Sequence, residues 1–211
     1  MNIMGPLSKE EIEKIVDRIE DGNGKKWGAS LSLSVKIICV HPETSKIVMV
    51  KNQEKEIAPG KIKKSMWELP GGGVHLKQSE SDETMNETPK AAAIRELSQE
   101  TGFSILSFEI DGILGGFQKH NIKNKKGSQA NPYHYDIVLL AHLKEMTIAT
   151  PGRVTSDPTE GTLAWDWVDP TRQIRERNGR YYYEMRDRNE QIHTNSMMMI
   201  NRFIFCSEDG D

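Results

Sequence analysis

The sequence contains little that could cross-link the chain covalently. It has 211 residues but only two cysteines, Cys39 and Cys206, which excludes the disulfide framework of a small secreted domain. Both cysteines lie in apolar runs, which predicts reduced, buried thiols; a single structural disulfide is the alternative. A chain of this length buries a substantial core without such cross-links.

Long apolar runs are also absent. The longest, such as residues 137–141, are far shorter than the roughly 18 residues that a membrane span requires. The N-terminal segment MNIMGPLSKEEIEKIVDRIEDG lacks the apolar core of a signal peptide. We therefore expect a cytoplasmic protein without a membrane partner.

The sequence has no excess of positive charge. Lys and Arg number 28 against 31 Asp and Glu, a net charge of −3, which excludes a uniformly basic nucleic-acid binder. Two segments are locally basic. Residues 119–126 contain four lysines, and residues 172–188 contain six arginines beside three tyrosines. Solvated loop lysines and charge pairing on a helix surface explain these segments better than a nucleic-acid site, which is the alternative.

Apolar periodicity predicts the order of the secondary structure. A helix is expected near the N-terminus, where Ser8 and Glu11 fit a capping box. A polar loop is expected over residues 53–64, and a second helix over residues 189–205. Strands are expected at residues 31–40, 47–50, 66–69, 105–110, 113–118, 135–143 and 163–168. Strands on both sides of one strong central helix predict the α/β class with a mixed sheet.

The central helix is expected to begin at Thr88-Pro89, where threonine caps and proline occupies the first helical position, and to end at Gly102. Glu96 and Glu100 lie four residues apart, so their carboxylates project from one face and repel each other. Solvent or a neighbouring arginine could compensate this repulsion. A divalent cation such as Mg²⁺, which prefers carboxylate oxygens, is the functional alternative.

Two segments around this helix resemble the Nudix box, the signature of the Nudix hydrolase family. They are WELPGGGV at residues 67–74 and ETPKAAAIRELSQETGF at residues 87–103. The family pattern runs Gly, five residues, Glu, seven residues, then Arg-Glu-apolar-any-Glu-Glu-any-Gly-apolar. Seven residues separate Glu87 from Arg95, and Gly102-Phe103 close the motif as the pattern requires.

The sequence departs from this pattern at three places. Fourteen residues separate Gly72 from Glu87, nine more than in the family, so residues 73–86 hold an insertion. Placing Gln78 at the first Glu position instead would break the helix register. His75 stands where the family often has Glu. Gln99 replaces the first residue of the Glu-Glu pair, so a neutral amide takes the place of one carboxylate.

The resemblance implies a Nudix-like α/β/α sandwich with a mixed sheet. We expect this domain over residues 31–170, with the box at 72–103. Residues 1–30 would form an N-terminal helical extension, and residues 171–211 a C-terminal helical segment packed on the same domain.

The resemblance also implies a pyrophosphohydrolase that uses Mg²⁺ or Mn²⁺ to hydrolyse a nucleoside diphosphate linked to another group. Glu96, Glu100 and the amide of Gln99 would hold the metal. Glu100, or alternatively Glu160, would orient or deprotonate the attacking water. The residues expected to support the site structurally are Gly72, Gly73, Glu87 and Arg95.

Two other functions stay open at this point. Gln99 would also suit a catalytically impaired Nudix-like domain that binds or senses a nucleotide. The basic segments would suit an RNA-processing enzyme of the same family. A homodimer is expected only by analogy with the family.

Overall fold

The computed structural model describes most of the chain. The described residues are 3–20, 31–76, 86–119, 133–144, 162–184 and 189–205. The chain divides into two compact units. Unit 1 comprises Met1–Ile37, Gly71–Glu96 and Ile110–Leu140, and unit 2 comprises Ile38–Pro70, Leu97–Glu109 and Ala141–Asp211. Three strands and one helix contribute residues to both units.

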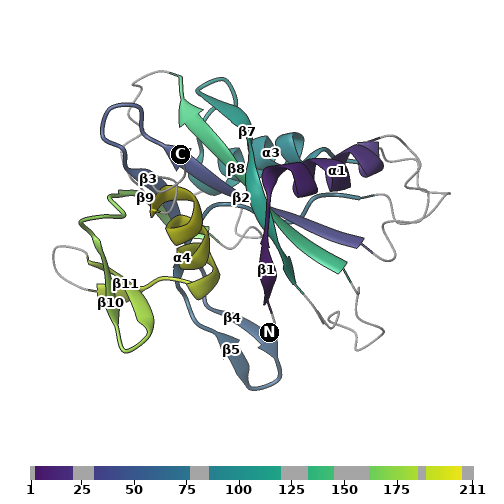
Figure 1. Ribbon diagram of the computed structural model, residues 1–211. Coiled ribbons are helices and arrows are strands. Elements are labelled where there is room, and N and C mark those ends of the chain that lie inside the picture. The colour runs from purple at the N-terminus through teal and green to yellow at the C-terminus, as the bar shows by residue number, and fades with distance from the viewer. Residues whose placement is uncertain are drawn as a thin grey trace. The chain divides into compact units, whose positions relative to one another are not determined.

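Unit 1 combines β-strands with two helices (Figure 1). The strands that contribute to it follow the order β1 (Ile3–Leu7), β7 (Phe108–Lys119), β8 (Tyr133–Leu143) and β2 (Leu31–Val40), and β1 is antiparallel to β7. The helices are α1 (Lys9–Glu20) and α3 (Pro89–Thr101).

The core of unit 1 follows the alternation of side chains along its strands. On β2, Leu33 and Val35 are buried, whereas Ser32 and Ser34 between them are only half-buried. A cavity of about 350 Å³ is lined by Val16 of α1, Pro89 of α3 and Leu139 of β8, among others. Both helices therefore lie against the face of β8 that carries Leu139.

Unit 2 is built around strand β3 (Ile47–Asn52). This strand is antiparallel to β2, β6 (Trp67–Glu68) and β9 (Thr162–Val168). The other elements are the β4–β5 hairpin (Lys55–Ala58, Lys61–Lys63), the three-stranded sheet of β10 (Ile174–Arg177), β11 (Arg180–Glu184) and β12 (Asn189–Gln191), helix α4 (Thr194–Ile200) and the π-helical turn η1 (Asn201–Phe205).

Aromatic side chains fill the core of unit 2. The ring of Phe103 lies 4.9 Å from that of Trp165 and 6.2 Å from that of Trp167. Trp67 is buried edge-on against Tyr183, with 5.3 Å between ring centroids, and its Nε1–H donates to Glu190 over 2.6 Å. Such pairs stabilise a core by more than their buried area alone.

The α/β class with a mixed sheet is confirmed. The capping box of α1 is present, since Ser8 N–H donates to Glu11 Oε2 over 2.8 Å and Glu11 N–H donates to Ser8 Oγ over 3.2 Å. Cys39 is buried, as expected, and forms no disulfide within the described residues, whereas Cys206 lies outside them. In the described part of the chain, no helix has the length and apolar character needed to cross a membrane.

The prediction of a helical C-terminal segment was wrong for residues 174–191, which form β10, β11 and β12. Asn178 and Gly179 both have positive φ, at 52° and 68°, and join β10 to β11 in a two-residue turn. Asn-Gly at this position is a strong hairpin signal. The expected helix over residues 189–205 accordingly begins only at Thr194.

Two other local predictions were wrong, and a third was incomplete. Residues 53–64 form the β4–β5 hairpin around Pro59-Gly60 instead of a loop. One strand, β7, takes the place of the two strands expected at 105–110 and 113–118. It begins only at Phe108, because residues 104–107 form a turn in which Ile105 and Leu106 are exposed. The N-terminal extension contains strand β1 in addition to its helix, because residues 3–7 pair with the edge of β7.

Replacing Ser8 with alanine should lower the free energy of unfolding by about 1 kcal/mol, because the first turn of α1 loses its side-chain cap. Lys9→Ala is the matched control on the same helix. It removes only the exposed Lys9–Glu13 ion pair and should cost less than about 0.5 kcal/mol. Urea denaturation of both variants checks the difference, and equal losses would contradict the capping role.

Candidate active site

The segment that carries the Nudix-box residues consists of a turn, a neck and helix α3. The predicted helix bounds are confirmed. Thr88 Oγ1 accepts the N–H of Ala91 over 3.1 Å at the start, and the chain leaves the helix at Gly102 with φ of 76°. Ahead of the helix, Gly71 has φ of 144° and lies so close to Val35 O that a Cβ would be 2.0 Å from it. Only glycine fits this turn.

Hydrogen bonds between His75 and Glu87 close the neck of the insertion. The His75 N–H donates to Glu87 Oε2 over 2.9 Å, and the Glu87 N–H donates to His75 O over 2.8 Å. Residues 77–85 lie outside the described residues. The hydrogen bonds between His75 and Glu87 therefore hold the glycine turn next to the start of α3 in spite of the nine additional residues.

Arg95 binds four acceptors with one guanidinium group. Its Nε and Nη2 donate to the two oxygens of Glu87, each over 2.9 Å, in a bidentate pair. Its Nη1 donates to Glu96 Oε1 over 2.6 Å, and its Nη2 also donates to Gly73 O over 2.9 Å. The hydrogen bond to Glu87 raises the pKa of Arg95 further above its usual range, and bidentate charged pairs of this kind are strong.

The contact with Arg95 favours the ionised form of the Glu87 carboxyl group. Burial alone raises its pKa, but the hydrogen bonds from Arg95 and the His75 N–H, with the charge of Arg95, outweigh burial and bring the pKa below its ordinary value of 4.5. Glu87 and Arg95 thus form a permanent ion pair at neutral pH.

Glu96 is buried, with 7% of its surface exposed. Its carboxylate lies directly against Gly72, where a Cβ would be 2.3 Å from Glu96 Oε1 and 2.7 Å from Oε2. The missing side chain of Gly72 thus provides the space that the carboxylate occupies, while Arg95 fixes its orientation. The structure brings Gly72, Gly73, Glu87, Arg95 and Glu96 together in unit 1.

Glu100 lies one turn further along α3 and is 6% exposed. The hydroxyl of Thr162 donates to its Oε1 over 3.5 Å. Thr162, at the start of β9, is a contact that the sequence patterns did not indicate. Because α3 is continuous, Glu96 and Glu100 project from the same face of the helix.

Of the two other residues predicted for the site, the structure describes only Gln99. Gln99 is half-buried on α3. Because its side chain is a neutral amide, the predicted metal ligands include two carboxylates, Glu96 and Glu100, instead of three. Glu160 lies outside the described residues. Among the residues that the structure describes, no group of three or more His, Cys, Asp or Glu side chains is placed to hold a metal ion.

The donor chemistry nevertheless fits a hard divalent cation. Two buried carboxylates one turn apart supply the oxygens that Mg²⁺ prefers, and an amide oxygen can serve as a neutral third ligand. Mg²⁺ usually binds one or two carboxylates, with water and substrate phosphates completing its coordination. The roles of these residues stay predictions.

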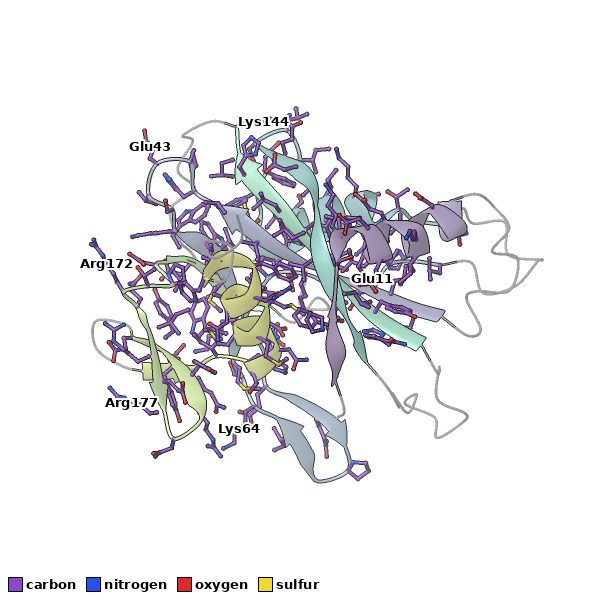
Figure 2. All side chains as sticks on the ribbon, in the orientation of Figure 1. Glu11, Glu43, Lys64, Lys144, Arg172 and Arg177 are labelled. Carbon is purple, nitrogen blue, oxygen red and sulfur yellow. The ribbon has the colours of Figure 1, made fainter. Side chains whose placement is uncertain are left out.

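The basic segments are accounted for only in part. Residues 120–132 and the arginines at 186 and 188 lie outside the described residues. Arg175 and Arg177 both pair with Glu184, at 3.5 and 3.2 Å, across the β10–β11 hairpin, which confirms charge pairing but on strands instead of a helix. Figure 2 labels Arg172 and Arg177, whose side chains extend from the β10–β11 region.

A family model described as NUDIX domain matches residues 31–186. The chain therefore belongs to the Nudix hydrolase family. A comparison with curated proteins gives no significant match.

Solved structures similar to the chain share little sequence with it. The MutT protein from Methanosarcina mazei Go1 is 17% identical, with a TM-score of 0.43 over 67% of this chain and 78% of that one. The E. coli dihydroneopterin triphosphate pyrophosphohydrolase is 14% identical, with a TM-score of 0.42 over 66% and 81%. An ADP-ribose pyrophosphatase from Streptococcus suis 89-1591 is 18% identical, with a TM-score of 0.37 over 66% and 75%.

The lowered pKa of Glu87 predicts a pH dependence of stability. A carboxyl group with a depressed folded pKa contributes stability above its unfolded pKa, and this contribution is lost as the pH falls through the folded value. The free energy of unfolding should therefore fall more steeply below about pH 5 in the wild type than in Glu87→Gln. Denaturant titrations between neutral pH and about pH 3 compare the two slopes. Parallel curves would refute the contribution of this ion pair.

Proposed function

We propose that the chain is a metal-dependent hydrolase of the diphosphate bond in a nucleoside diphosphate linked to another group. The observation that carries the proposal is the pair of buried carboxylates on one face of α3, Glu96 oriented by Arg95 against Gly72 and Glu100 against Thr162. Arg95 already pairs with one oxygen of Glu96, and the two carboxylates one turn apart supply oxygens of the kind that Mg²⁺ prefers.

Glu96, Glu100 and the amide oxygen of Gln99 would hold the metal. A bound Mg²⁺ or Mn²⁺ would neutralise charge on the diphosphate oxygens and lower the pKa of a water molecule. Glu100 would orient that water or accept its proton, with Glu160 as the alternative acceptor. Arg95 would not contact the substrate, because its donors bind Glu87, Glu96 and the Gly73 carbonyl.

A nucleotide-binding domain without catalysis is the second candidate. Gln99 favours it, since the amide removes one negative charge from the ligand set that the family pattern provides. No described contact favours the RNA-processing alternative, because Arg175 and Arg177 are paired with Glu184. The cytoplasmic location and the homodimer stay predictions from the sequence and the family resemblance.

An activity assay separates the two candidates. With Mg²⁺ or Mn²⁺ present, the wild type should release a nucleoside monophosphate from at least one of a panel of nucleoside diphosphate derivatives. Glu100→Gln should reduce kcat by at least about 100-fold through loss of the ligand charge and proton acceptor. Glu109→Gln, an exposed glutamate on β7, is the matched control and should retain full activity.

The same assay on Gln99→Glu tests the ligand set. The third carboxylate should tighten Mn²⁺ binding and raise activity at low metal concentration. Nucleotide binding without turnover, unaffected by Glu100→Gln, would contradict the hydrolase and favour the binding domain.

Gly72→Ala tests the position of Glu96. The new Cβ would displace the flexible end of the Glu96 side chain, so Mn²⁺ affinity should fall by about tenfold or more while the fold is retained. Gly73→Ala is the neighbouring control, because a Cβ there has no heavy atom within 4 Å. Titration with Mn²⁺ followed by electron paramagnetic resonance measures both affinities. Equal affinities in the two variants would contradict the role of Gly72.

A further inference from the structure

A cavity of about 350 Å³ lies in unit 1 and is lined by residues of helix α1, the first turn of α3 and strands β7 and β8. We call it the α1 cavity. Pro89, which lines it, precedes Glu96 by seven residues, or about 10 Å along the axis of α3. Helix α1 lies outside residues 31–186, which the family model matches. One wall of the α1 cavity is therefore an addition to the Nudix domain, and the cavity is separate from the candidate active site.

Two glycines of β7 differ in what surrounds them. A Cβ on Gly116 would lie 2.6 Å from Asp136 O of β8 and 2.7 Å from Ile12 Cδ1 of α1, so close packing requires glycine there. Gly112 lines the α1 cavity, and a Cβ on it would have no heavy atom within 4 Å. Packing within the chain therefore does not require glycine at position 112. A glycine inside a strand often marks a place where a ligand approaches closely.

The walls of the α1 cavity are mostly apolar. Four buried residues line it, namely Val16, Pro89, Ile110 and Leu139. Ligand pockets typically have volumes of about 300–1,000 Å³, apolar walls and a few polar groups that orient the ligand. A dry cavity of about 150 Å³ already holds benzene, so the α1 cavity has room for a larger apolar group. Its walls thus fit a molecule with an apolar body.

Charges of both signs lie at the rim of the α1 cavity. The Glu13 side chain is 45% exposed and lies 3.7 Å from Lys9, an exposed contact of little strength that leaves the carboxylate accessible. Lys90 is exposed in the first turn of α3, where no acidic residue is present, so its charge adds to the positive end of the helix dipole. Asp111 also lines the cavity but has an interaction of its own within the protein. A ligand with one ammonium and one carboxylate group would complement Glu13 and Lys90.

We propose that the α1 cavity binds a small zwitterion with an apolar body, of the class of the apolar α-amino acids. The ammonium group would pair with Glu13 and the carboxylate with Lys90, as charge-assisted hydrogen bonds. The apolar side chain would lie against Val16 and Leu139 and occupy the open space beside Gly112. This binding site does not depend on the proposed hydrolase function.

Titration calorimetry with L-leucine, L-phenylalanine and L-tryptophan tests the ligand class. The wild type should bind at least one of them with a Kd of about 1 mM or lower. For that amino acid, the amine that lacks the carboxylate and the acid that lacks the ammonium group should each bind at least about tenfold more weakly. The absence of saturable binding by all three amino acids would overturn the site. An amine or acid analogue that binds as tightly as the amino acid would overturn recognition of the zwitterion.

Gly112→Val tests the location of the site. The φ of Gly112 is outside the left-handed region, so valine can adopt the same backbone conformation. Its side chain would enter the cavity without a clash and suits a strand better than glycine. The variant should bind the amino acid at least about tenfold more weakly and have a melting temperature at or above that of the wild type. A folded Gly112→Val protein with unchanged affinity would contradict the proposed location.

Substitutions at the rim test the two charged contacts separately. Glu13→Gln and Lys90→Gln should each weaken the amino acid about three- to tenfold. Glu13→Gln should leave the affinity of the acid analogue unchanged, and Lys90→Gln that of the amine analogue. Asp17→Asn is the matched control, because Asp17 is exposed on the same helix and is not among the residues that line the cavity. Rim variants that bind the amino acid as tightly as Asp17→Asn would refute both contacts.

Discussion

The hydrogen bonds of the Arg95 guanidinium determine where Glu87, Gly73 and Glu96 lie in the candidate site. Arg95 holds Glu87 at the neck of the insertion, the Gly73 carbonyl in the turn and Glu96 on its own helix. These groups come from three segments of the chain, and a planar cation with fixed donors is the side chain that can orient them together. The metal-binding role proposed for Glu96 depends on this arrangement, because an unanchored carboxylate would pay rotamer entropy on binding an ion.

Much of this arrangement could be predicted from the sequence. The helix bounds follow from Thr88, Pro89 and Gly102, each of which acts through local backbone geometry that does not depend on the rest of the fold. The resemblance to the Nudix box indicated Glu87 and Arg95 as supporting residues, and the two form a bidentate contact in spite of the insertion. These features were predictable because their causes lie within short stretches of sequence.

Other features depend on distant residues, and the sequence patterns did not indicate them. Thr162 meets Glu100 only because β9 pairs with β3, and the contact between Ser32 and His134 requires β2 and β8 to be neighbours. The β10–β11 hairpin is different, because Asn178-Gly179 was a local signal that the charge pattern of the arginine-rich segment obscured. Helical charge pairing and cross-strand charge pairing draw on the same residues, so composition alone could not separate them.

The proposed activity requires that Glu96 and Glu100 together bind a divalent cation. Anomalous diffraction from crystals grown with Mn²⁺ tests it most directly, because manganese is located independently of the protein model. We expect an anomalous peak coordinated by carboxylate oxygens of both Glu96 and Glu100. Absence of a peak at these residues under saturating Mn²⁺, or an ion bound only at other carboxylates, would contradict it.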